Sequence, residues 1–240
     1  LVLGNALAAR FPDNAMIPNI LGVIYSGLRR YDEATVCFKQ AIELNPDYSE
    51  AHYNCGNALT KLGKFEEAII RYNSVIATKI DDEQAINKIG NALNQLHRYD
   101  DAIINFKKAI ELKPDVSEIY NNYGIALLEL NRYDAAARFF KHAIQINPGY
   151  SEAYNNLGNA SYILGVYESA HINHRNSLIM APNYAEIYNN IANTLREFGR
   201  CEEAISYFNR SRKCLNFRIR SFNCITCFII SFYNIILKME

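Results

Sequence analysis

The sequence predicts an all-α fold, a solenoid of tandem helix-turn-helix repeats, and three recurring features predict it. A small residue returns once per period, at Gly22, Gly56, Gly90, Gly124 and Gly158 and then as Ala192. A second small residue recurs in phase with it, at Ala34, Ala68, Ala102, Ala136, Ala170 and Ala204. A proline closes most periods, at Pro12, Pro46, Pro114, Pro148 and Pro182. A fixed period of about 34 residues is typical of a helix-turn-helix repeat.

These markers divide the 240 residues into a half repeat, six repeats and a tail. Residues 1–14 align with the end of a repeat, so we expect the second-helix remnant of a truncated repeat and a chain that is a fragment of a longer protein. The six tandem units are predicted at 15–48, 49–82, 83–116, 117–150, 151–184 and 185–218. Residues 219–240 leave the pattern as an apolar tail. Its uncharged part, 221–237, predicts a capping helix, a short membrane segment or a sequence altered by a frameshift, and these alternatives stay open.

Each unit is predicted to hold two amphipathic helices. Tyr120, Tyr123 and Leu127 share one face of the first helix of the fourth unit. The second helices carry a large aromatic residue, at Phe38, Tyr72, Phe106, Phe140 and Phe208. We expect the small residues to lie where two helices cross closely, and the aromatic residue beside them to fill the gap between units. His174 and Ser161 depart from the pattern, so the fifth unit is expected to be the loosest packed.

Helix ends also have recurring signals. Left-handed turn residues are predicted after the first helices, at Gly63, Asn131, Gly165 and Gly199. Capping boxes are predicted at the starts of first helices, as Asp47 with Glu50, Asp81 with Gln84, Asp115 with Glu118, and Asn183 with Glu186.

Composition and motifs argue against several function classes. The formal net charge is zero, and Tyr and Arg form no basic-aromatic stripe, so nucleic acid is not an expected partner. The six cysteines do not follow the period, which favours a reducing, intracellular and cytoplasmic setting over a disulfide framework. His171 with His174, and Cys224 with Cys227, are too few ligands for zinc. We find no phosphate loop or nucleophile elbow, and we expect no cofactor, no metal and no enzymatic activity.

The unit resembles the tetratricopeptide repeat over nearly the whole array. Its small slots, aromatic slot and closing proline recur in phase, although the family's frequent Trp in the first helix is absent. The resemblance implies a right-handed superhelix whose concave wall is formed by the first helix of each unit. Partners would then be a protein or an extended peptide.

A narrower resemblance concerns the runs AHYNCGNAL, IYNNYGIAL, AYNNLGNAS and IYNNIANTL. They are similar to the arrays of O-linked N-acetylglucosamine transferases and of bacterial multi-repeat proteins with sulfotransferase or glycosyltransferase domains. In the transferase family an asparagine ladder on the concave wall binds the backbone of extended substrate segments. The resemblance places this ladder at Asn54, Asn122, Asn156 and Asn190, and Lys88 and Ile20 interrupt it.

Asparagine recurs at other slots as well. One series precedes the ladder by one residue, at Asn19, Asn87, Asn121, Asn155 and Asn189, and another follows it, at Asn57, Asn91, Asn159 and Asn193. Asn is a poor helix former, so its retention implies a compensating role. A primary amide can pair with a peptide group in both directions, which predicts peptide binding by the ladder and by the series that follows it. The alternative is that these amides bond neighbouring repeats and set the pitch of the array.

We therefore predict a non-catalytic scaffold that binds an extended peptide or a partner protein in a concave groove. Two alternatives stay open. The array could be the substrate-recruiting arm of a peptide-modifying transferase whose catalytic domain lies outside this chain, or a purely architectural array that associates with itself. A wall of periodic glutamates, Glu50, Glu118, Glu152 and Glu186, that binds basic peptides is a further interpretation of the same surface.

Overall fold

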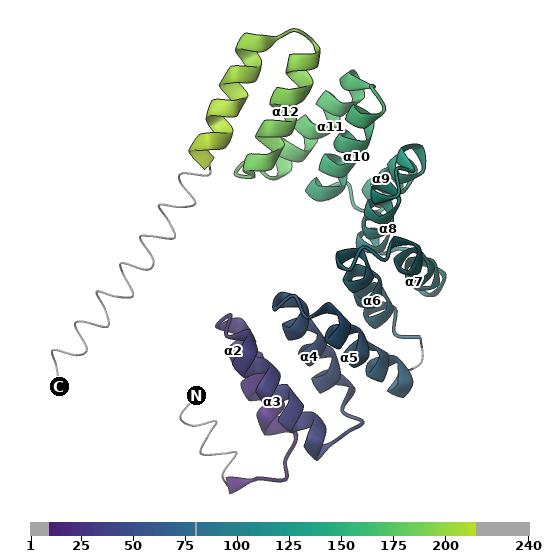
Figure 1. Ribbon diagram of the computed structural model, residues 1–240, viewed down its shortest axis with the longest axis vertical. Coiled ribbons are helices and arrows are strands. Elements are labelled where there is room, and N and C mark those ends of the chain that lie inside the picture. Colours follow the sequence, from purple (N-terminus) through teal and green to yellow (C-terminus); the bar gives the residue numbers. More distant parts are fainter. Residues whose placement is uncertain (1–9, 80, 215–240) are drawn as a thin grey trace, which may run out of the picture. The chain divides into compact units, whose positions relative to one another are not determined.

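The computed structural model describes residues 10–79 and 81–214, and every regular element in these ranges is a helix (Figure 1). The predicted remnant at 1–14 falls mostly outside the described residues, and the tail at 219–240 falls wholly outside them. The chain divides into two compact units, residues 1–132 and 133–240, which are taken one at a time below.

Each unit is a stack of antiparallel helix pairs in which every helix packs on the next. The first unit contains α2 (Met16–Gly27), α3 (Tyr31–Leu44), α4 (Ser49–Lys61), α5 (Phe65–Thr78), α6 (Glu83–Gln95), α7 (Tyr99–Leu112) and α8 (Ser117–Glu129). The second contains α9 (Tyr133–Ile146), α10 (Ser151–Ile163), α11 (Tyr167–Met180) and α12 (Ala185–Glu197), followed by helical residues 201–214. The prediction of an all-α helical repeat solenoid is confirmed.

First helices of consecutive repeats also touch one another, which places their side chains on a common surface. These contacts join α2 to α4 and α6 to α8 in the first unit, and α10 to α12 in the second. In the first unit, Figure 1 shows α5 to the right of α4 and α7 to the right of α6.

Glycine permits the close crossing of the two helices in a repeat. A Cβ built on Gly90 would lie 2.5 Å from Cε1 of Phe106, and one on Gly22 would lie 2.5 Å from Cε1 of Phe38. The alanine slot of the second helix is equally enclosed, because Ala34, Ala68 and Ala102 are fully buried. The expected close crossing at the small residues is confirmed, and the ring that fills it belongs to the same repeat.

Left-handed residues end the first helices. Gly63, Asn131, Gly165 and Gly199 have positive φ, as predicted, and so do Arg29 (φ 59°) and His97 (φ 58°), which the sequence pattern did not reveal. The amide that follows each of these residues bonds back to the preceding helix, as in Arg30 N to Tyr25 O at 2.9 Å and Arg98 N to Leu93 O at 2.9 Å. The turn is therefore imposed by these backbone bonds even where no glycine is present.

The predicted capping boxes are wrong. The residues that precede α4, α8 and α12 are Tyr48, Val116 and Tyr184, and none of them caps its helix with a side chain. At α6 the cap is Asp82, whose carboxylate accepts from Ala85 N at 3.0 Å, and Asp81 takes a positive φ instead. The spacing of acid and Glu resembles a capping box, but each helix begins one residue later than that motif requires.

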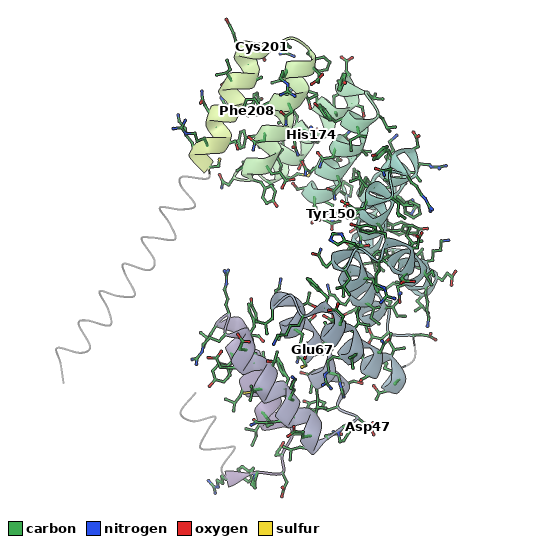
Figure 2. The ribbon with its side chains drawn as sticks, viewed as in Figure 1. Asp47, Glu67, Tyr150, His174, Cys201 and Phe208 are labelled. Atoms are coloured by element: carbon green, nitrogen blue, oxygen red, sulfur yellow. The ribbon has the colours of Figure 1, made fainter. Side chains whose placement is uncertain are left out.

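The fifth repeat has a polar interior where we expected loose packing. His174, which is labelled in Figure 2, is only 1% exposed, and its Nε2 lies 3.1 Å from Asn159 Oδ1. Ser177 is also buried, and it exchanges hydrogen bonds with Ser151, Ser177 Oγ donating to Ser151 O at 2.8 Å and Ser151 Oγ to Ser177 O at 3.0 Å. The side chains that break the apolar pattern are thus hydrogen-bonded to each other and to the backbone.

Candidate peptide-binding surface

The candidate surface begins with three amide pairs that join consecutive first helices. Asn54 Nδ2 donates to Asn19 Oδ1 at 3.3 Å, Asn122 Nδ2 to Asn87 Oδ1 at 3.2 Å, and Asn190 Nδ2 to Asn155 Oδ1 at 3.0 Å. In every pair the predicted ladder residue is the donor, and the acceptor comes from the preceding repeat. We call these contacts the inter-repeat amide pairs.

The two members of each pair differ in exposure. Asn19, Asn87 and Asn155 are 2%, 5% and 7% exposed, whereas Asn54, Asn122 and Asn190 are half-buried. A buried amide needs a hydrogen-bonding partner in the protein, so the acceptor of each pair has a structural role. The donor keeps its second Nδ2 hydrogen and its oxygen, because it forms no other side-chain bond within the described ranges.

Two glutamates of the periodic series extend the amide pairs. Glu50 Oε1 accepts from Asn19 Nδ2 at 3.2 Å, and Glu118 Oε1 accepts from Asn87 Nδ2 at 3.3 Å. Asn19 and Asn87 therefore each accept from the ladder residue and donate to the glutamate of the same neighbouring helix. These glutamates brace consecutive repeats rather than cap the helices that carry them.

The remaining asparagine series, at Asn57, Asn91, Asn159 and Asn193, differs in its hydrogen bonding according to the residue at the aromatic position of the second helix. Tyr72 Oη donates to Asn57 Oδ1 at 2.9 Å, and His174 faces Asn159 in the same way. Asn91 and Asn193 stand at the same slot in repeats that carry Phe106 and Phe208, whose rings offer no polar atom. Neither side chain has a hydrogen-bonding partner in the part of the chain that the structure describes.

The two polar partners in this series stay neutral near neutral pH. Burial raises the pKa of the Tyr72 hydroxyl to about 12. Burial, with a smaller contribution from His171, lowers the pKa of the His174 imidazole to about 4. Asn57 and Asn159 are thus held by neutral groups, and the asparagine surface carries no charge of its own.

Two positions of the asparagine ladder remain, Asn156 and the interruption at Lys88. Asn156 lies on α10 beside Asn155, is half-buried, and lines a pocket together with Glu186. Lys88, which interrupts the ladder, directs its Nζ to Glu118 Oε1 at 3.2 Å. The sequence analysis missed the roles of Lys88 and Tyr72. Lys88 lies 30 residues before Glu118, in the preceding repeat, and Tyr72 lies 15 residues after Asn57, in the same repeat, so neither pairing is visible until the packing of the helices is known.

Within the described residues we find neither a metal-binding cluster nor a membrane-spanning helix. No group of three or more His, Cys, Asp or Glu side chains in the described ranges could hold a metal ion. No helix within residues 10–79 and 81–214 has both the length and the apolar character needed to cross a membrane.

Sequence profiles of one family match successive parts of the chain. Profiles described as "TPR repeat" or "Tetratricopeptide repeat" match residues 22–63, 51–86, 81–149 and 185–220. No curated protein sequence matches the chain significantly.

Solved structures with a similar fold share less than a quarter of their residues with the chain. The crystal structure of MamA is 24% identical, with a TM-score of 0.61 over 69% of this chain and 96% of that chain. PilF of Pseudomonas aeruginosa is 19% identical, with a TM-score of 0.70 over 82% and 89%. YrrB, described as a TPR protein with an unusual peptide-binding site, is 18% identical, with a TM-score of 0.58 over 75% and 92%. At these identities the likeness concerns the fold alone.

Proposed function

The chain is a tetratricopeptide-repeat protein, and from that premise we propose that it is a non-catalytic interaction scaffold that binds an extended segment of a partner protein along its first helices. Solenoids of stacked repeats offer long continuous surfaces of this kind. The peptide-binding site described for YrrB belongs to a protein of the same fold and is in keeping with this proposal.

The observation that carries the proposal is the fixed orientation of side-chain amides that still have a hydrogen-bond donor and acceptor available. Asn54, Asn122 and Asn190 are each held by a buried asparagine, yet they remain half-buried and keep a donor and an acceptor. Groups that are already ordered lose little entropy when a ligand binds, which favours affinity.

The chemistry of the ligand follows from the chemistry of the amide. An asparagine side chain donates and accepts, so it can satisfy both the N–H and the C=O of a peptide group. Amides repeated at the spacing of the repeats would bond a backbone in an extended conformation with little regard for its side chains. The predicted contacts are Asn54, Asn91, Asn122, Asn156, Asn190 and Asn193, with Asn57 and Asn159 oriented by Tyr72 and His174.

The proposal is tested by replacing Asn91 and Asn193, whose side chains have no hydrogen-bonding partner among the described residues. In the full chain, Asn91→Ala with Asn193→Ala should weaken binding to an array of extended peptides. It should also raise helix stability by about 0.5 kcal/mol per site, because Ala is the better helix former. The measurements are array binding and thermal unfolding followed by circular dichroism.

Asn105→Ala is the matched control, since it removes an amide from the second helix α7, where Asn105 Nδ2 donates to Asp101 O at 2.9 Å, and it should leave peptide binding unchanged. The contrary result is peptide binding that is unchanged both in Asn91→Ala with Asn193→Ala and in Asn122→Ala with Asn190→Ala. That result would show that the asparagines have a structural role and do not bind the peptide. Failure of the unaltered chain to bind any peptide would favour the architectural alternative.

A further inference from the structure

Two pockets occupy equivalent places two repeats apart. One lies between the first turns of α6 and α8, has a volume of about 190 Å³, and is lined by Glu83, Lys88, Lys113 and Glu118 among others. The second lies between α10 and α12, has a volume of about 340 Å³, and is lined at the corresponding positions by Ser151, Asn156, Ala181 and Glu186. We call them the α6–α8 pocket and the α10–α12 pocket.

The α6–α8 pocket supplies its own cations. Lys88 Nζ lies 3.2 Å from Glu118 Oε1, and Lys113 Nζ lies 3.3 Å from Glu83 Oε1. The two lysines balance the charge of the two carboxylates. This pocket therefore shows how the fold places an ammonium group against the glutamate of the following first helix.

The α10–α12 pocket keeps the carboxylate and lacks the cations. Asn156 stands in the place of Lys88 and Ala181 in the place of Lys113, while Glu186 stands in the place of Glu118. Glu152 replaces Gln84 and adds a second carboxylate to the lining. Glu186 forms no hydrogen bond or ion pair within the described residues. The pocket is thus larger, and its Glu186 carboxylate has no counter-ion among the described residues.

We propose that the α10–α12 pocket binds a lysine or arginine side chain of the partner segment, so that its cation takes the place that Lys88 takes two repeats earlier. The inference rests on the proposed function, because the segment must lie along the first helices to present the side chain. Its aliphatic stem would pack on Tyr184 and Ile187, which also line the pocket, while the charged end reaches Glu186. A surface that otherwise binds the peptide backbone would then also select for one basic side chain.

The test is a peptide array in which each position of an extended peptide is scanned with Lys, Arg, norleucine and citrulline. We expect one register position at which Lys and Arg bind roughly two- to fivefold more tightly than their uncharged counterparts, the range for a partly exposed ion pair. The preference should shrink as ionic strength rises, since exposed charges are screened.

Three variants of the full chain assign the preference to the pocket. Glu186→Gln should abolish it, and Asn156→Lys should abolish it by supplying an internal cation. Glu118→Gln is the matched control and should leave it intact, because Lys88 already neutralises that carboxylate. Binding to the norleucine peptides reports separately on any loss at the asparagine ladder, and circular dichroism checks that each variant is folded.

Each outcome decides the question. Peptide binding without a basic preference, or a preference that Glu186→Gln leaves unchanged, overturns this inference and leaves the proposed function standing. Absence of binding to every peptide overturns both.

Discussion

At the residue scale, His174 shows how a single substitution changes the interior of a repeat. It stands where Phe38, Tyr72 and Phe106 stand in other repeats, and it is as deeply buried as they are. Its ring lies 3.1 Å from Asn159 Oδ1 and 3.4 Å from Thr194 Oγ1. Burial of the ring, and to a smaller degree His171, lowers the pKa of the imidazole to about 4. The interior tolerates the ring only in its neutral form.

This burial predicts a loss of stability in mild acid. The folded pKa lies below that of an unfolded histidine, so between pH 6.5 and 4 the unfolded state binds more protons than the folded one. Above pH 6.5 His174 does not lower the free energy of unfolding. As the pH drops from 6.5 to 4, His174 should lower that free energy by up to about 3 kcal/mol. Chemical denaturation at a series of pH values would measure it.

His174→Phe is the control for that experiment, because phenylalanine is the residue that this slot carries in other repeats. The difference in unfolding free energy between the two proteins removes the contribution of surface carboxylates. A difference that does not vary with pH would show that His174 is not buried as described.

At the scale of the element, the two helices of a repeat are held together by the contact of a glycine with a ring. Within the first unit this contact recurs as Gly22 with Phe38, Gly56 with Tyr72 and Gly90 with Phe106. The ring is fully or almost fully buried in all three. The helix pair therefore depends on the absence of one methyl group at each crossing.

The close crossing predicts that Gly→Ala has opposite effects on stability at two glycines. Gly90→Ala should destabilise the chain by roughly 1–3 kcal/mol, because the new Cβ would lie 2.5 Å from Phe106. Gly27→Ala should stabilise it by about 0.5–1 kcal/mol, because no atom beyond its chain neighbours and the adjacent backbone of its own helix lies within 4 Å of its Cβ position. Thermal unfolding compares the two variants, and equal effects at both sites would contradict the close crossing.

At the scale of the whole molecule, the stability of a repeat array depends on how strongly each repeat is coupled to the next. The inter-repeat amide pairs and the glutamates beside them are polar contacts across these boundaries. In the boundary between α6 and α8, Asn87 accepts from Asn122 and donates to Glu118. Apolar packing accompanies them, since Ile89 and Ile119 are buried on the same helices.

A double-mutant cycle would measure this coupling. Asn87→Ala and Asn122→Ala, alone and together, should give an interaction energy of about 1 kcal/mol, because either single change leaves a buried or half-buried amide without its partner. Asn87→Ala with Asn190→Ala provides the control, and these two changes should be additive. Additivity in the first pair would mean that the amides do not couple the repeats.

Much of the fold could be predicted because its signals are local and repeated. The positions of Gly90 and Phe106 within the period predicted the close crossing, and the glycines at positions 63, 165 and 199 predicted the turns. Arg29 and His97 show where this failed, since their left-handed conformation is imposed by the bonds from Arg30 and Arg98 to the preceding helix. The candidate site was predictable as a set of asparagines, but not as pairs.

The sequence by itself determined the repeat length, the helices and the small and aromatic residues at their crossings, because periodic burial selects the same residue type in every copy. Only the tertiary structure decided what the asparagines and glutamates do. Stacking places Asn87 against residues of the next repeat, so one amide becomes buried and its partner stays accessible. The same stacking leaves Glu186 without the lysine that Glu118 has. Partners a full repeat apart along the chain have no local signature, and their chemistry appears only when the repeats pack.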